Sequence, residues 1–190
     1  MKRLGTIFFC TLLLTQVVAN AEDLNKAKLK TQLIQHEGKR LKVYKDSEGI
    51  PTIGVGFNLK KKDAKSKIEA LGLPYKDVLE GRVSLTDAQA DTLLKGDIET
   101  AISDCESVVE GYSELSDIRK RVVVDMTFNL GKTRFSEFKK MLAALKAKDF
   151  NKAAVEMKDS KWCKQVKTRC STLEQMMQAN KDPSWLKDAD

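Results

Sequence analysis

The spacing of apolar residues predicts helices over most of the chain. Between residues 24 and 37, the side chains of Leu29, Leu33 and Ile34 fall at helical spacing and share one face. The second half of the chain repeats this pattern, with short polar loops between the apolar runs. We expect four helices there, at 116–129, 134–147, 149–160 and 165–178.

A β-hairpin interrupts the helical pattern directly after the first helix. In "LKVY" (41–44) the apolar positions recur at every second residue, which is the period of a strand. A polar turn, "KDSEG", follows it. In "TIGVGF" (52–57) we expect Ile53, Val55 and Phe57 on one face and the glycines on the other. Glycines on one strand face indicate a bulge or a close approach by another chain.

The longest predicted helix begins at a clear N-terminal signal. Thr86 is a good N-cap, and Gln89 completes a capping box with it. The apolar face continues past Gly96, so we expect the helix to run to Val108. The fold class is therefore α+β and mainly α. We expect a small N-terminal lobe with a short antiparallel sheet (22–85), a connecting helix (86–108) and an all-helical lobe (109–190).

The N-terminus has the pattern of a secretory signal peptide. "MKR" is cationic, a long uncharged run follows, and "ANA" is a small-residue cleavage site, so we expect residues 1–21 to be removed by a cut after Ala21. A retained membrane anchor is the alternative, because residues 4–21 are just long enough to span a bilayer. Cleavage is favoured, since Thr, Gln and Asn dilute the apolar run.

The net charge of the chain limits the classes of partner that it is expected to bind. The formal net charge is +7 and the pI is near 9.1; removing Lys2 and Arg3 with the signal lowers +7 to +5. A basic surface favours anionic partners such as nucleic acid, membrane surfaces or cell-wall polymers. An exported protein does not meet genomic DNA, so we expect no nucleic-acid partner. Because we expect the signal peptide to be removed, we expect no stable membrane anchor. We expect the protein to be a secreted monomer.

The cysteines predict one possible disulfide and no metal site. Cys163 and Cys170 lie seven positions apart in "WCKQVKTRC", and a straight helix would hold them about 10 Å apart. A bridge between them therefore needs a helix break. Cys105 is the odd cysteine, either buried or an intermolecular partner. With His36 as the single histidine and no Cys-x-x-Cys pair, we expect no metal and no cofactor, and we expect His36 at the surface.

Two carboxylates near the hairpin suggest glycoside hydrolysis. That reaction needs one acid that protonates the leaving oxygen and one ionised carboxylate that activates water or attacks the sugar. Glu37 lies among apolar neighbours at a helix end, which favours the protonated form of a carboxyl group. Asp46 lies in the polar turn and should stay ionised, and the Thr52 hydroxyl is placed to hold a water near it. Taken alone, both acids are also ordinary cap and turn residues.

Their spacing makes the case more specific. Glu37, Asp46 and Thr52 are separated by eight and five residues, and "TIGVG" contains the threonine. This stretch resembles the T-even phage-type lysozymes, glycoside hydrolase family 24. "DMTFNLG" (125–131), "FNKAAVEMKDSKW" (150–162) and "TDAQADTLL" also resemble family segments, so that the likeness covers about residues 28–187.

The resemblance implies a lysozyme-like two-lobe fold and a role for each site residue. Glu37 would be the general acid, Asp46 the base that activates or positions water, Thr52 its helper, and Arg169 the cation that pairs with Glu37. The substrate would be the β-1,4 bond between N-acetylmuramate and N-acetylglucosamine in peptidoglycan, cleaved with inversion. The expected substrate-binding residues are Phe128, Asn58 and Asn129.

The chain also departs from the family at several positions. Phe57 stands where members commonly have histidine, and Asp97, the usual partner of that histidine, is expected to lack it. We expect an effect on stability or a repacked contact there and no loss of chemistry. Asn58, Met141 and Glu156 replace other residue types at the cleft, so recognition of the sugar and peptide should differ.

Three functions remain open from the sequence. The chain could be a secreted bacteriolytic muramidase, a membrane-tethered endolysin, or a non-catalytic wall-binding protein on the same fold. The intact trio of Glu37, Asp46 and Thr52 favours the first. Phage lysis, remodelling of a bacterium's own wall and digestion of bacteria are all compatible with it.

Overall fold

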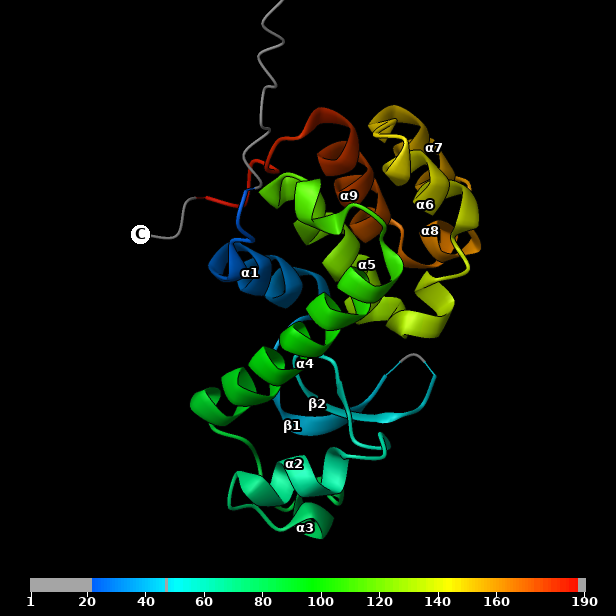
Figure 1. The fold of residues 1–190 in the computed structure, drawn as a ribbon. Helices are drawn as coiled ribbons and strands as arrows, with labels where there is room; N and C mark the ends of the chain where they lie inside the picture. The colour runs from blue at the N-terminus through cyan, green and yellow to red at the C-terminus, as the bar shows by residue number, and fades with distance from the viewer. Residues whose placement is uncertain (1–21, 47, 188–190) are drawn as a thin grey trace, which may run out of the picture.

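The computed structural model describes residues 22–46 and 48–187 and shows a mainly helical protein of two lobes (Figure 1). The expected signal peptide lies outside the described residues. In chain order, the elements are α1 (Lys26–Glu37), β1 (Arg40–Lys45), β2 (Pro51–Gly54), β3 (Phe57–Asn58), α2 (Ala64–Ala70), α3 (Tyr75–Leu79), α4 (Asp87–Val108), η1 (Tyr112–Glu114), α5 (Asp117–Phe135), α6 (Lys139–Lys146), α7 (Phe150–Lys158), α8 (Lys161–Val166) and α9 (Thr168–Ala179). The predicted fold class is confirmed.

The three strands form an antiparallel sheet in the order β1-β2-β3. The single alternating strand expected at 52–57 is wrong, because the chain turns between β2 and β3. Gly54 and Gly56 adopt positive φ values of 65° and 70° on either side of that turn, a conformation that glycine adopts without steric cost. As a result, Ile53 and Phe57 pack in the small lobe, whereas Val55 packs in the core of the large lobe.

Helices α2 and α3, which the sequence analysis did not predict, cover the sheet and complete the small lobe (Figure 1). Ile68 of α2 and Val78 of α3 are fully buried in one core with the sheet residues Ile53 and Phe57 and with Leu59, which follows β3. Both helices are short, and Gly72 and Pro74 separate them. They gain their stability from this packing, since helices of this length are marginal in isolation.

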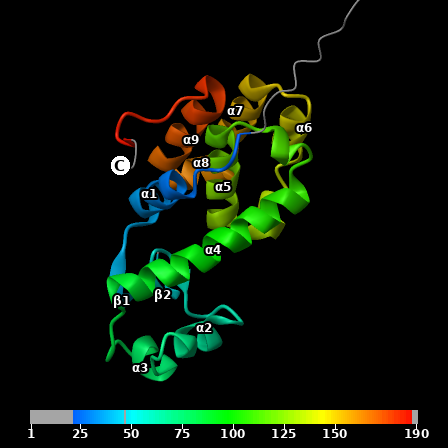
Figure 2. The same ribbon diagram turned by 60° about the vertical axis from the view of Figure 1, so that its left-hand side comes forward.

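Helix α4 connects the two lobes (Figure 2). Its predicted N-terminus is confirmed: the Thr86 side chain accepts from the Gln89 N–H, and the Gln89 side chain accepts from the Thr86 N–H. The helix contributes to two cores in turn. Leu93 packs in the small lobe, while the next residue, Leu94, packs in the large one.

The large lobe is built from α5 to α9, and α1 packs with it. Leu29 and Leu33 of α1 are fully buried in the core of this lobe, although the sequence analysis counted residues 22–85 as the N-terminal lobe. The chain therefore crosses from the large lobe to the small one directly after Glu37. Glu37 stands at that crossing point.

Several helix boundaries differ from the prediction, and the helix expected at 134–147 begins only at Lys139. Helix α5 extends to Phe135, with a non-helical residue at Gly131 (φ 75°). The helix expected at 165–178 begins at Thr168, because Lys167 adopts φ 45° and separates α8 from α9. This is the helix break that a bridge requires, and Cys163 and Cys170 do form a disulfide, with their Cα atoms 5.1 Å apart.

Cys105 is a free thiol buried in α4. Its Sγ donates to the carbonyl of Val123 at 3.3 Å and lies 3.0 Å from Thr127 Oγ1. Burial raises the pKa of the thiol to about 12. Of the two roles left open for Cys105, the structure supports the buried one.

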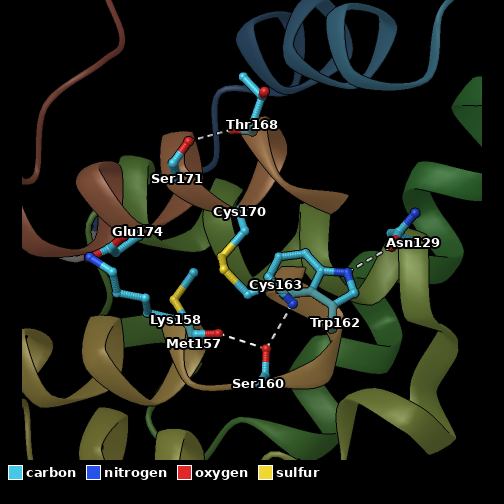
Figure 3. The surroundings of a disulfide bond; sticks show 10 residues. All are labelled: Asn129, Met157, Lys158, Ser160, Trp162, Cys163, Thr168, Cys170, Ser171 and Glu174. Carbon is cyan, nitrogen blue, oxygen red and sulfur yellow. Dashed lines mark hydrogen bonds and ion pairs between the residues drawn. A yellow bond between two sulfur atoms is a disulfide. The ribbon is translucent and has the colours of Figure 1, made fainter. Parts of the chain in front are cut away.

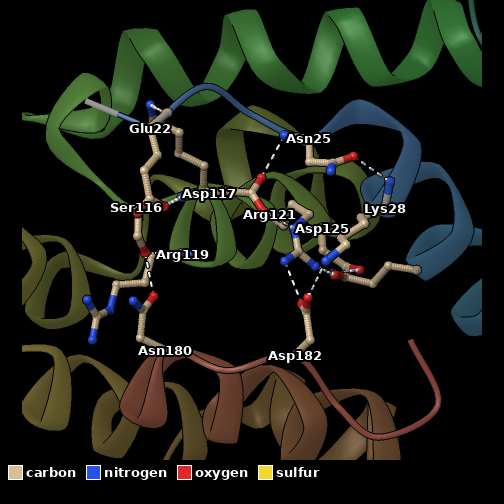
Figure 4. Close-up of polar contacts among 12 residues, drawn as sticks. Glu22, Asn25, Lys28, Ser116, Asp117, Arg119, Arg121, Asp125, Asn180 and Asp182 are labelled. Atoms are coloured by element: carbon tan, nitrogen blue, oxygen red, sulfur yellow. Dashed lines mark hydrogen bonds and ion pairs between the residues drawn. The ribbon is translucent and has the colours of Figure 1, made fainter. Parts of the chain in front are cut away.

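A buried arginine ties both ends of the described chain to α5. Arg121 is fully buried, donates from Nε to Asp117 (3.0 Å) and from Nη2 to Asp182 (2.5 Å) in the C-terminal segment (Figure 4). Asp117 in turn accepts from the N–H of Asn25 at 2.6 Å. Its own N–H donates to Glu22 at 2.9 Å. The chain is thus held to α5 at Glu22 and Asn25 on one side and at Asp182 on the other.

Candidate active site

Glu37 is the last residue of α1, and its side chain is 19% exposed. The helix ends there because Gly38 adopts φ 72° and returns its N–H to the Ile34 carbonyl at 2.9 Å. A helix C-terminus repels a carboxylate. Arg169 opposes this effect: its Nη1 donates to Glu37 Oε1 at 2.5 Å. The pairing of Arg169 with Glu37, expected from the resemblance, is confirmed.

The glycine-rich turn after β2 lies against the same carboxyl group. A Cβ atom added to Gly56 would lie 3.2 Å from Glu37 Oε2, closer than side chains ordinarily pack. The absence of a side chain at Gly56 lets the backbone of the small lobe approach an acid held by the large lobe. The glycines of "TIGVG" thus permit a close approach, to another part of the same chain and not to another chain as expected.

Asp46 follows β1 and organises the hairpin turn. Its Oδ1 accepts from the N–H groups of Glu48 (2.9 Å) and Ile50 (2.8 Å), as in an Asx turn. The side chain is half-buried, so one carboxylate sits in a polar, partly solvated turn while the other is held at a helix end.

Thr52 is bound to the residue that also holds Asp46. Its hydroxyl donates to the Ile50 carbonyl at 3.0 Å, while the Ile50 N–H donates to Asp46. Thr52 is 3% exposed and pairs with Tyr44 of β1 across the sheet. Because the hydroxyl proton is used internally, the lone pairs of Thr52 Oγ1 are left to accept from a water molecule.

A buried acidic residue that the sequence analysis missed supports Arg169. Asp125 of α5 is fully buried and accepts from Arg169 Nε at 2.8 Å and from Gln32 Nε2 at 2.7 Å. Burial alone would raise its pKa, but Arg169, His36 and Gln32 together hold the pKa of Asp125 below its ordinary value. Burial alone would lower the pKa of Arg169, but the carboxylates of Asp125 and Glu37 outweigh this effect and raise it. Arg169 is thus a permanent cation between two acids.

The expectation that His36 lies at the surface is wrong. Its side chain is 7% exposed, and Nδ1 lies 2.9 Å from Asp125 Oδ2. The Trp185 ring covers it edge-on, with the ring centroids 5.9 Å apart. His36 and Glu37 are neighbours in α1, so one end of this helix supplies both a partner of Asp125 and a partner of Arg169. The available signal was Asp125 itself, a lone acid in the apolar run "VVVDMTF".

The three expected substrate-binding residues have different surroundings. Asn129 donates from Nδ2 to Glu37 Oε1 at 3.4 Å and accepts from Trp162 Nε1 at 2.8 Å. Phe128 is partly buried against the large core. Asn58 accepts from the Lys60 N–H at 2.7 Å. Of the three, Asn129 is the one that contacts the candidate acid, and the roles of all three in substrate binding stay predictions.

A groove of about 890 Å³ lies between the hairpin turn and the large lobe. Glu48 lines its hairpin side, and Trp162 lines the opposite wall. Met141 and Glu156, two of the positions where this sequence departs from the family pattern, also line it. A groove of this size accommodates a ligand of several sugar rings or a peptide.

Asp97 has no histidine at position 57 to pair with, and it is paired with two lysines. Lys61 Nζ lies 2.9 Å and Lys67 Nζ 3.4 Å from its carboxylate oxygens. The same two ammonium groups lie 5.4 and 5.8 Å from the centroid of the Phe57 ring. Asp97 lacks the family's histidine, as expected, and the two lysines pair with it instead. The repacked contact expected there is confirmed.

Within residues 22–46 and 48–187, no group of three or more His, Cys, Asp or Glu side chains is arranged to hold a metal ion. Over the same residues, no helix is both long and apolar enough to cross a bilayer.

Glu37 at a helix end, paired with the buried Arg169, and Asp46 in the hairpin turn are the two carboxylates in different surroundings that glycoside hydrolysis needs. Comparisons with known proteins agree. The family model described as "Phage lysozyme" matches residues 34–179. Probable T4-type lysozyme 2 and probable T4-type lysozyme 1 of Dictyostelium discoideum are each 31% identical, over 76% of this chain and 90% of their own length. The endolysin of Salmonella phage P22 is 32% identical over 65% of this chain and 74% of its own.

The chain belongs to the phage lysozyme family. It is a glycosidase of the muramidase type, and its substrate is peptidoglycan.

Proposed function

We propose that Glu37 is the general acid of this muramidase and that Asp46 activates the attacking water with the help of Thr52. Glu37 donates its proton to the glycosidic oxygen as the bond to the anomeric carbon breaks. Asp46 accepts a proton from the water that attacks that carbon from the opposite face, so the product has the inverted configuration. The observation that carries this proposal is the position of Glu37, fixed by Arg169 on one side and by Gly56 on the other.

Arg169 supports the step in which Glu37 gives up its proton. After Glu37 has given its proton to the leaving group, it carries a negative charge beside a helix C-terminus, where that charge is disfavoured. The adjacent guanidinium stabilises this anion and keeps the carboxyl group in one orientation for the next proton. Asp125 accepts from Nε at another edge of the guanidinium. This second contact holds the cation in place when the charge of Glu37 changes.

The activity test compares wild type with Glu37→Gln on purified peptidoglycan. Turbidity loss and new reducing ends are measured together, and nuclear magnetic resonance of the fresh product gives its anomeric configuration. Glu69→Gln, an exposed substitution on α2, is the matched control. We expect wild type and Glu69→Gln to clear the suspension and Glu37→Gln to release no reducing ends. A folded Glu37→Gln protein with full activity would remove Glu37 from the role of acid, and an inactive folded wild type would favour the wall-binding alternative.

We further propose that the enzyme is exported and acts on whole bacteria as a monomer. Three features support export: the N-terminal signal pattern, the basic charge, which suits anionic cell walls, and the Cys163–Cys170 bridge, a bond that persists in oxidising compartments. N-terminal sequencing of the mature protein tests export, because a cut after Ala21 excludes a retained anchor. Light scattering of the purified protein tests the monomer, and killing of intact bacteria tests bacteriolysis.

A further inference from the structure

The Cys163–Cys170 disulfide joins the immediate neighbours of two side chains that lead to Glu37. Cys163 follows Trp162 in α8, and Cys170 follows Arg169 in α9. Figure 3 shows the bond between the two helices, with the Trp162 ring extending from α8 to Asn129. The disulfide therefore connects the backbone under one of these side chains to the backbone under the other.

Both side chains act on the same atom. Arg169 Nη1 donates directly to Glu37 Oε1 at 2.5 Å. Trp162 Nε1 donates to Asn129 Oδ1 at 2.8 Å, and Asn129 Nδ2 in turn lies 3.4 Å from Glu37 Oε1. Trp162 is 4% exposed and Arg169 7% exposed, so neither contact is a loose surface interaction.

The backbone between these residues consists of a short helix and a joint of unusual conformation. Helix α8 has six residues, fewer than an isolated helix needs for stability. Lys167, at the joint with α9, adopts φ 45° and ψ −104°, a conformation that a side-chain-bearing residue rarely adopts. Asp125 fixes the guanidinium end of Arg169, but the backbone end depends on how α9 begins. A covalent bond across the joint supplies that restraint.

We propose that the Cys163–Cys170 disulfide is a positioning device for the catalytic carboxyl of Glu37. By holding α8 against the start of α9, it fixes the positions of Trp162 and Arg169 relative to each other. Trp162 contacts Glu37 through Asn129, and Arg169 contacts it directly. The inference rests on the proposed role of Glu37 as the acid. A purely stabilising role explains the bond less well, because it closes a loop with a sequence separation of only 7, and short loops restrict the unfolded chain least.

The first experiment removes the bond in two independent ways. The variant Cys163→Ala/Cys170→Ala lacks both sulfurs. In the second, dithiothreitol gives two electrons and two protons to the disulfide, which becomes two thiols while the reagent closes to its cyclic disulfide. Cys163 is half-buried and Cys170 fully buried, so attack at Cys163 is expected. Cys105→Ala, treated identically, controls for the third thiol.

Initial rates are measured on soluble peptidoglycan fragments, at a temperature where near-ultraviolet circular dichroism shows that every sample is folded. We expect kcat to fall roughly tenfold or more, as for a displaced catalytic group, with KM within about twofold of wild type. Reoxidation should restore kcat in wild type and in Cys105→Ala. In an Arg169→Ala background, removing the disulfide should lower kcat further by much less than it does in wild type.

The outcomes separate this inference from the proposed function. Unchanged kcat in folded, disulfide-free enzyme, with only a lower melting temperature, would overturn the positioning role and leave Glu37 as the acid. Full additivity with Arg169→Ala would also overturn it. If the double variant does not fold, the reduced wild type provides the same comparison. Full activity of Glu37→Gln would instead show that the assignment of the acid is wrong.

Discussion

The carboxylate of Glu37 and the guanidinium of Arg169 lie 2.5 Å apart (Oε1–Nη1), although 132 positions separate these residues in the chain. Arg169 also binds Asp125, so one planar cation is shared between a buried acid and a partly exposed one. A rigid, five-donor group suits this geometry better than a flexible ammonium does. Activity should therefore depend on the shape of this cation as well as on its charge.

Replacing Arg169 with lysine tests this dependence. Lys keeps the charge but cannot donate to both carboxylates in the same fork, so we expect kcat to fall roughly ten- to hundredfold with a smaller change in KM. Arg82→Lys is the control, because Arg82 pairs with Asp77 at the surface of the small lobe. Reducing-end release from soluble fragments measures both. Equal kcat for Arg169→Lys and wild type would show that charge alone is sufficient.

The buried Asp125 should make the protein sensitive to acid. Its pKa is lowered in the folded state, so it contributes stability above the unfolded value of about 3.9. That stability is lost as the pH falls below this value and through the lower folded pKa. Urea unfolding between pH 7 and pH 2 should show this loss in wild type and a flatter acid limb in Asp125→Asn.

The Asp125→Asn variant should also be less stable at neutral pH. Removing one partner of a buried ion pair leaves Arg169 poorly compensated, and we expect a cost of about 3–5 kcal/mol. Asp104→Asn on α4 serves as the control, because the Asp104 side chain is partly exposed. An acid limb in Asp125→Asn as steep as that of wild type would assign the acid sensitivity to other carboxylates.

The close approach of Gly56 to Glu37 predicts a specific effect on catalysis. Gly56→Ala would add a Cβ 3.2 Å from Glu37 Oε2 at a residue with φ 70°. Gly72→Ala is the matched control, because it has a similar φ of 76° but open space around its Cβ. Both should destabilise the fold by about 1–2 kcal/mol through backbone strain, and Gly56→Ala should additionally lower kcat. Similar kcat values for the two folded variants would mean that the turn yields without moving Glu37.

The ion cluster around Asp97 should contribute to stability and leave catalysis unchanged. Asp97 is 8% exposed and pairs with Lys61 and Lys67, so we expect Asp97→Asn to cost about 1 kcal/mol at low salt and less in 1 M salt. Glu99→Gln, which breaks the exposed pair with Lys26, should cost less than this. Urea unfolding at both salt concentrations measures the difference. A large loss of kcat in Asp97→Asn would contradict the structural role.

Features of the fold that depend on neighbouring residues could be predicted from the sequence. The start of α4 follows from Thr86 and Gln89, and the hairpin with its Asp46 turn follows from alternation and turn residues. A close approach at the hairpin follows from the glycines of "TIGVG", although the turn that they make divides the expected strand in two.

Tertiary contacts could not be predicted in the same way. Asp125, Gln32 and His36 lie on two helices, and nothing in their spacing shows that they meet. Arg169 came from the family resemblance and not from its sequence context. The break at Lys167 depends on how α8 and α9 pack. The cysteine spacing therefore indicated only that a disulfide would require a helix break.

The burial of Cys105 has a consequence for how the correct disulfide is chosen. Three thiols follow Ala21 in the chain, and an unfolded chain can pair them in three ways. Exchange requires a thiolate, and a thiol with a pKa of about 12 supplies almost none at neutral pH. Once the large core closes around α4, Cys105 withdraws from exchange, and Cys163 finds Cys170 as its remaining partner. The packing of α4 thereby favours the correct disulfide between α8 and α9.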